Sequence, residues 1–299
     1  EQEFTQNLFG RIAYVGSHSS HLTTFIEENP AQANDSGTDG PRRFPEYSTI
    51  TDINDGSNAI YHSLQATLQQ RLAHGLTVLA NYTWSKSIDD LPYDWGDGLS
   101  YVYPLTYPNF RSLDRGRSDF DRRHVFSGSY VWKLPKLTGH AVAVRAIANG
   151  WETTGIVQLQ SGDALTVIST ADTSGTALGQ DRAVYNGQTP YSHAACPYNS
   201  GPCRSFLNVA AFSVPDNGTF GNVHKGAFVG PWYADWDAGI YRTFPIHEDV
   251  ALQFRAEYFN VLNHTNLADP VNDVAASGFG NVNGNGSYTP RIAQFSLKL

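Results

Sequence analysis

The sequence predicts an all-β protein, an antiparallel β-barrel that crosses a membrane. Three features support this prediction: apolar and polar side chains alternate along several long segments, long and short connections alternate between those segments, and aromatic residues gather near their ends. A period of two places successive side chains on opposite faces of a strand. A long strand with one apolar and one polar face fits a wall between lipid and water.

The clearest alternation lies in residues 236–262, and it predicts two strands joined by the short polar segment 245–248. The second strand has an apolar face made of Val250, Leu252, Phe254, Ala256 and Tyr258. Its other face is polar, as is one face of the strand before it and of the strand at 151–160. We predict that these polar residues face the water-filled lumen of a barrel: Gln253, Arg255, Glu257, Asp235, Asp237 and Gln158.

Further segments with the same period are predicted as strands, which makes about eight strands in total. These segments are residues 8–16, 57–70, 76–84, 123–134, 151–160 and 291–299. The connections run long, short, long, medium, long, short and long, a pattern typical of bacterial outer-membrane barrels with long outer loops and short periplasmic turns. Aromatic residues near the strand ends match the belts at lipid–water boundaries: Tyr82, Trp84, Trp132, Trp151, Trp236 and Tyr258.

Composition narrows the alternatives. The net charge of −8 argues against nucleic-acid binding, which requires basic patches. No run of about 18 apolar residues predicts a membrane helix. Cys196 and Cys203 are separated by a segment rich in Pro and Gly, which predicts a local disulfide and an oxidising compartment; two free thiols are the alternative. A secreted, carbohydrate-binding β-sandwich remains possible, although sandwich strands are commonly shorter.

Candidate binding residues lie in the predicted outer loop 86–121. Aromatic rings beside carboxylates there could hold a sugar or peptide, or could pack the loop against itself: Trp95, Tyr101, Tyr103, Tyr107, Asp94 and Asp97. His124 with Asp119 and Asp121 could form a catalytic or metal cluster at a strand mouth, but pairing of these aspartates with Arg122 and Arg123 is the preferred interpretation. The sequence predicts no catalytic residue, no metal site and no cofactor.

Four blocks of sequence resemble the C-terminal barrel of Oar-like TonB-dependent transporters. They are YHSLQATLQQRLAHGLTVLANYTWSKSIDD, DFDRRHVFSGSYVWKLP, GWETTGIVQLQSGDALTV and FRAEYFNVLNHTNL, in this order along nearly the whole chain. The resemblance implies that residues 1–299 form one barrel domain, the last eight of about 22 strands. It places a plug and a carboxypeptidase-regulatory-like domain outside this chain, and family members usually end with an aromatic residue just beyond a segment like the one ending at Leu299.

The resemblance also implies a function. Members of this family sit in the bacterial outer membrane, contact its lipid, and take up a bulky nutrient such as an oligosaccharide, a peptide or a metal chelate. The energy comes from the TonB–ExbB–ExbD complex through an N-terminal region that this chain lacks. No covalent chemistry is involved, so the protein is not expected to be an enzyme. A small outer-membrane barrel enzyme or adhesin, including a closed eight-stranded barrel, is the alternative.

Overall fold

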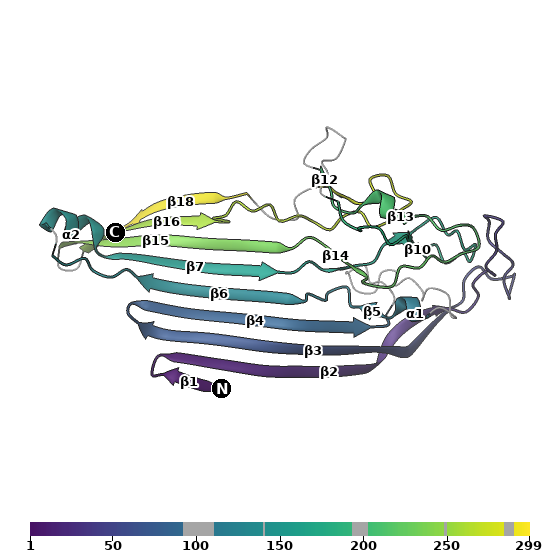
Figure 1. Ribbon diagram of the computed structural model, residues 1–299, viewed down its shortest axis with the longest axis horizontal. Helices are drawn as coiled ribbons and strands as arrows, with labels where there is room; N and C mark the ends of the chain where they lie inside the picture. The colour runs from purple at the N-terminus through teal and green to yellow at the C-terminus, as the bar shows by residue number, and fades with distance from the viewer. Residues whose placement is uncertain (92–110, 140, 193–202, 248–249, 284–289) are drawn as a thin grey trace.

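A single antiparallel sheet dominates the computed structural model, which describes residues 1–91, 111–139, 141–192, 203–247, 250–283 and 290–299 (Figure 1). The strands lie in the order β1-β2-β3-β4-β6-β7-β15-β16-β18, and β5 pairs with β4. Consecutive strands are therefore neighbours, as in a barrel wall. Their bounds are β1 (Gln2–Thr5), β2 (Leu8–Glu27), β3 (Thr51–Ala73), β4 (Leu76–Asp89), β5 (Gly116–Arg117), β6 (His124–Lys133), β7 (Trp151–Gln160), β15 (Tyr233–His247), β16 (Val250–Phe259) and β18 (Ile292–Lys298).

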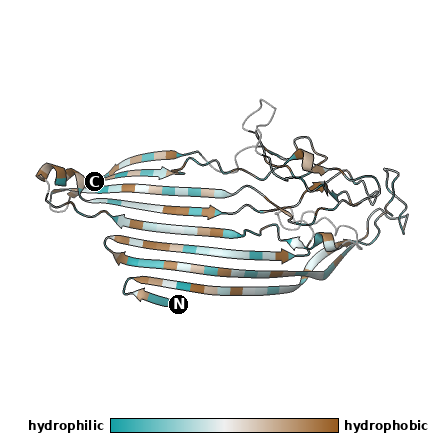
Figure 2. Cartoon of the chain, in the orientation of Figure 1, coloured by the Kyte–Doolittle hydropathy of each residue, from teal (hydrophilic) through white to brown (hydrophobic). Residues whose placement is uncertain are grey.

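The pairing register places apolar side chains of neighbouring strands directly opposite one another. Leu64 of β3 lies opposite Tyr14 of β2 and Trp84 of β4, and Ala256 of β16 lies opposite Ile240 of β15. Because side chains directly opposite share a face, these pairs build one continuous apolar face. We call it the apolar face, and the opposite side the polar face. The alternation along each strand is visible in the hydropathy colouring (Figure 2).

Long and short connections alternate as predicted. The turn between β3 and β4 consists of His74 and Gly75, both with positive φ (52° and 79°), which matches the twist that a two-residue hairpin needs. At the other end of the sheet, long segments join β2 to β3, β4 to β6, and β7 to β15 (Figure 1).

Several strands are longer than the sequence predicts. Residues 17–55 were expected to be a loop, but β2 runs on to Glu27 and β3 begins at Thr51. Likewise β15 continues to His247, into the expected turn 245–248. These extensions are paired strand with strand, although they lack a regular apolar stripe. The ladder of backbone hydrogen bonds therefore continues where the side-chain pattern gives no signal.

Several elements were not predicted from the sequence, among them the following two. Strand β1 adds an edge beside β2, and the connection 134–150 contains the helix α2 (Val142–Ala148). By contrast, the strand predicted at 151–160 coincides with β7. Among the described residues no pairing joins β1 to β18, so the sheet is open and does not form the closed eight-stranded barrel of the alternative. None of the described helices is long and apolar enough to cross a membrane.

A second layer lies beyond one end of the sheet (Figure 1). We call residues 161–192, 203–231 and 263–283 the loop layer. Short strands and a 3-10 helix form it, paired β10-β9, β11-β13, β12-β17 and β14-β8. Their bounds are β8 (Ala164–Leu165), β9 (Ile168–Ser169), β10 (Asp181–Arg182), β11 (Val184–Tyr185), β12 (Cys203–Ser205), η2 (Val209–Ala211), β13 (Phe212–Ser213), β14 (Phe228–Val229) and β17 (Asn281–Asn283).

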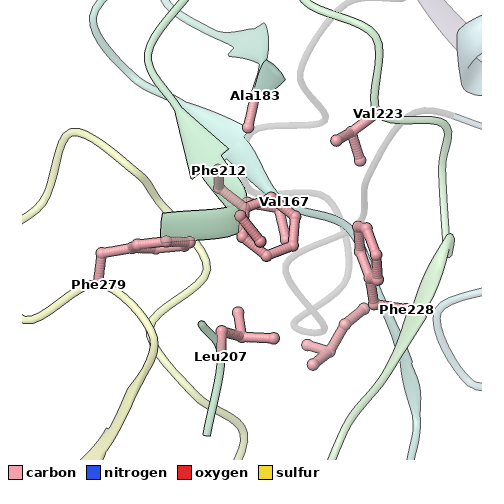
Figure 3. Close-up of a cluster of buried hydrophobic side chains, with 9 residues drawn as sticks. Val167, Ala183, Leu207, Phe212, Val223, Phe228 and Phe279 are labelled. Carbon is pink, nitrogen blue, oxygen red and sulfur yellow. The ribbon is translucent and has the colours of Figure 1, made fainter. Parts of the chain in front are cut away.

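The buried hydrophobic cluster of the chain sits in this loop layer. Val167 and Leu207 are completely buried, and the ring of Phe212 packs edge-on against Phe228 and Phe279, with centroids 5.0 and 5.7 Å apart (Figure 3). Such edge-to-face packing is the favoured geometry of buried aromatic rings. The loop layer therefore has an apolar core of its own, separate from the sheet.

Candidate functional site

The candidate site is the polar face of the sheet. Gln158 of β7 lies opposite Asp235 of β15, and Glu257 of β16 lies opposite Gly239 of β15. The even spacing along each strand then brings all six residues predicted for the lumen to this one face: Gln158, Asp235, Asp237, Gln253, Arg255 and Glu257. Trp236, Ile240 and Ala256 take the apolar face.

A hollow of about 390 Å³ opens in the polar face near the middle of β6, β7 and β15 and at the end of β16. Its lining includes Asp237, Tyr241, Glu257, Ser129 and Gly239. The ring of Tyr241 lies over Gly239, where an added Cβ would come within 2.3 Å of the tyrosine hydroxyl. Glycine at this position therefore makes room for the ring, which was not apparent from the sequence.

The polar groups of the hollow are mainly hydrogen-bond acceptors, and they are set in a lining that also includes Val131, Ile156 and Phe259. The Tyr241 hydroxyl donates to Oε1 of Glu257 at 3.0 Å, and Oδ1 of Asp237 accepts from the backbone N–H of Asn260 at 2.9 Å. Next to them, Nε of Arg255 donates to Oε1 of Gln253 at 2.7 Å. Two carboxylates beside a tyrosine suit a ligand that carries hydroxyl or amine donors.

The rim between the sheet and the loop layer is held by other ion pairs than those expected. Asp121 pairs with Arg117 at 2.6 Å, and Asp119 lies 3.4 Å from Lys225. Arg122 reaches Asp163 instead, with Nε 2.7 Å from Oδ1. The preferred pairing with Arg122 and Arg123 is therefore wrong for Asp121, and Asp119 has Lys225 as a cationic neighbour.

The suggested catalytic or metal cluster at this rim does not assemble either. Nδ1 of His124 is 2.7 Å from the Tyr82 hydroxyl, while both aspartates point to cations. Within the described part of the chain, no group of three or more His, Cys, Asp and Glu side chains could hold a metal ion. The rim is a structural joint.

Buried ion pairs fasten the loop layer to the end of β4 and to the helix in the segment that follows β4. Nζ of Lys225 lies 2.6 Å from Asp89 at the end of β4, and Arg182 lies 2.6 Å from Asp114 in the helix α1 (Arg111–Asp114). The side chains of both pairs are almost completely buried. The sequence gives no signal for these contacts, because the two members of each pair are far apart along the chain.

Comparison with known proteins shows the family of this chain. A family model described as "Outer membrane beta barrel domain" matches residues 1–294. The chain belongs to this family. Among curated proteins, no sequence matches. Among solved structures, the crystal structure of the outer membrane transporter YddB from Escherichia coli matches with 13% sequence identity and a TM-score of 0.48, covering 99% of this chain and 30% of that chain.

Membership of the outer membrane beta barrel domain family places the chain in the bacterial outer membrane. In a barrel of this kind the apolar face contacts lipid and the polar face lines the interior. Large side chains on the apolar face are exposed accordingly: Ile12 (73%), Tyr14 (69%), Phe295 (62%) and Leu297 (67%). The soluble β-sandwich is excluded by the family.

The remaining predicted site residues lie outside what the structure describes. They are the ligand-binding candidates Trp95, Tyr101, Tyr103, Tyr107, Asp94 and Asp97, together with Cys196 and the side chain of Cys203. These remain predictions, as does the role of the six polar-face residues in a lumen.

Proposed function

We propose that this chain is barrel wall of an Oar-like TonB-dependent transporter, which takes up a bulky nutrient through the outer membrane. One observation carries the proposal: the sheet stays open and presents a polar, hollowed face. A closed barrel of eight strands has an interior that its own side chains just fill. An open sheet with a polar face instead suits a wider barrel that is completed by further strands, because lipid cannot satisfy unpaired strand edges.

In this proposal the predicted outer loop 86–121 and the polar face of the sheet divide the work. The outer-loop residues Trp95, Tyr101, Tyr103 and Tyr107, with Asp94 and Asp97, capture the ligand. The polar-face hollow at Asp237 and Glu257 then offers acceptors to its hydroxyl or amine groups on the way inward. The proton gradient drives the movement through TonB–ExbB–ExbD. The motifs of the four sequence blocks and the family support the proposal.

The test is uptake by cells that produce the whole protein, with and without TonB. Three labelled probes represent the ligand classes: an oligosaccharide, a peptide and a ferric chelate. We expect at least one probe to accumulate only when both the protein and TonB are present. Accumulation that persists without TonB would point to a passive pore and overturn the proposal, as would uptake of none of the probes by correctly inserted protein.

The hollow is tested with the same assay and the probe that is taken up. The double substitution Asp237→Asn and Glu257→Gln removes both negative charges and keeps the shape, so we expect slower uptake at low probe concentration. Glu152→Gln removes one carboxylate charge from β7 outside the hollow, and should leave uptake near the wild-type rate. Equal effects of the two variants would show that the hollow is not on the ligand's route.

A further inference from the structure

The helix α2 has an unusual surface. It lies in the connection between β6 and β7, at the end of the sheet away from the loop layer (Figure 1). Six of its seven residues are apolar and none is buried; Val142 and Ile147 are 73% and 70% exposed. A helix that is apolar all round belongs in a protein core or in lipid, not in water. No core covers this one.

The sheet holds α2 firmly by its C-terminal end. The guanidinium of Arg242 donates to the carbonyl oxygens of Ala146 and Ile147, and the indole Nε1 of Trp151 donates to Ile147 at 2.9 Å. A cation and donors at the last carbonyls of a helix are stabilising. Gly150, with φ of +85°, then turns the chain into β7.

These two anchoring side chains belong to the apolar face of the sheet. Trp151 and Arg242 lie directly opposite each other in β7 and β15, and Arg242 lies opposite Phe254 of β16. The guanidinium is 4.3 Å from the ring centre of Phe244 and 5.3 Å from that of Trp151, and Arg242 is 8% exposed. The helix therefore continues the apolar face. Its carbonyl oxygens accept from Arg242, and nearby rings stack on the guanidinium, so the charge is compensated on this face.

Charge distinguishes this connection from the rest of an acidic chain. Residues 134–150 contain Lys136 and Arg145 but no Asp or Glu, and Lys133 comes directly before them. A cationic segment next to exposed apolar side chains is attracted to anionic lipid headgroups. Seven helical residues span only about 10 Å, too short to cross a bilayer but suited to lie along its boundary.

We propose that α2 is an interfacial helix that binds the anionic phospholipid surface of the periplasmic leaflet. Val142, Val144 and Ile147 enter the acyl region, while Lys136 and Arg145 lie among the phosphates. Arg242 and Trp151 fix the helix against the wall so that it cannot lift away. The partner is thus the lipid surface itself, and the proposal rests on the membrane location and not on TonB-dependent uptake.

The test is the depth of a probe in a bilayer. A cysteine replaces Ile147 in the whole protein and carries an environment-sensitive fluorophore, and vesicles of phosphatidylethanolamine and phosphatidylglycerol contain a lipid with a nitroxide high on its acyl chain. Val209 in η2 is the matched control, being a 58% exposed apolar residue of a short helix in the loop layer. Ile240 on the apolar face is the lipid-exposed reference. The unsubstituted protein, treated with the same fluorophore, gives the background from Cys196 and Cys203.

We expect quenching at Ile147 at least as strong as that at Ile240, which lies deeper in the bilayer, and several-fold above that at Val209. Quenching at Ile147 no greater than at Val209, with Ile240 strongly quenched, would overturn the proposal. For the headgroup charge, Arg145→Glu in the labelled protein should reduce quenching in these vesicles but not in phosphatidylcholine alone. An equal result in both kinds of vesicle would rule out an anionic lipid as the partner.

Discussion

The sheet and the loop layer obey opposite rules within one chain. In the sheet, large apolar side chains such as Ile12 and Phe295 are 73% and 62% exposed. In the loop layer, Val167 and Leu207 are fully buried, and aromatic rings pack on one another. The loop layer is built like a small soluble domain, whose stability comes from burying apolar surface in water. The sheet relies on backbone ladders and on lipid to cover its apolar face.

This difference predicts which substitutions should destabilise each region. An apolar residue in the loop layer matters because other side chains surround it, so its loss leaves a cavity. An apolar residue on the sheet matters because lipid surrounds it, so a shorter apolar residue costs little and a charge costs much. The joint between the two regions follows a third rule, because buried ion pairs such as Lys225 with Asp89 hold it together.

The largest effect is expected from emptying the core of the loop layer. Phe212→Ala removes a ring that contacts Phe228, Phe279 and Tyr185, and should destabilise this layer by about 3–5 kcal/mol. Hydrogen–deuterium exchange should then show lost protection in residues 203–231 but preserved protection in β3 and β4. Val209→Ala, at an exposed position close by, should change little. Equal loss of protection in the strands would mean that the two regions unfold as one.

A charge on each face of the sheet tests the second rule. Ile240 faces lipid near the middle of β15, whereas Ile156 of β7 lies on the polar face opposite Asp237, and both are well exposed (42% and 55%). Ile240→Lys should destabilise the folded barrel by about 2–4 kcal/mol, because lysine is poorly solvated at mid-membrane depth. Ile156→Lys should cost much less, because it gains water and a nearby carboxylate. Urea titrations of the protein in lipid vesicles measure both, and similar costs would refute the assignment of faces.

The parts that the sequence predicts are those where neighbouring residues carry the signal. Strand β7 was found with its bounds because Trp151, Val157 and Leu159 alternate with polar residues. The extension of β2 to Glu27 was missed because it runs through Ser, His and Thr, which give no contrast between faces. In that segment only backbone hydrogen bonds to the neighbouring strand define β2. These bonds depend on residues that are distant in sequence.

Long-range packing explains the remaining misses. The helix α2 contains Val142 and Val144, which favour strands, and it is too short to show a helical period. Arg242 interrupts the apolar stripe of β15, and only the carbonyls of α2, 95 residues earlier in sequence, explain it. The core of the loop layer is assembled from single residues between turns, so no window of sequence contains it. The hollow was also missed, because the ring of Tyr241 fits over Gly239 only in the folded sheet.

The smallest expected effect is a pH dependence inside the loop layer, at Asp181. This residue is 1% exposed, and its carboxylate accepts from the backbone N–H of Ser174 at 2.9 Å. Burial raises the pKa of the Asp181 carboxyl above its ordinary value, and the negative charge of Asp172 adds to the effect while the hydrogen bonds oppose it. Between the ordinary and the raised pKa, the folded state holds a proton that the unfolded state has lost, so stability falls as pH rises through this window.

Asp181→Asn keeps the acceptor for Ser174 and removes the titration. We therefore expect the wild-type layer to gain stability over the variant as the pH is lowered from neutral towards the ordinary pKa of aspartate, about 3.9. Below that value both states of the wild type are protonated and the gain levels off. Exchange protection of residues 164–183, corrected for the intrinsic pH dependence of exchange, measures the difference. If the stability of the wild type and of the variant changed in parallel with pH, burial would not raise the pKa of the Asp181 carboxyl. Water would then reach this carboxyl in the folded state.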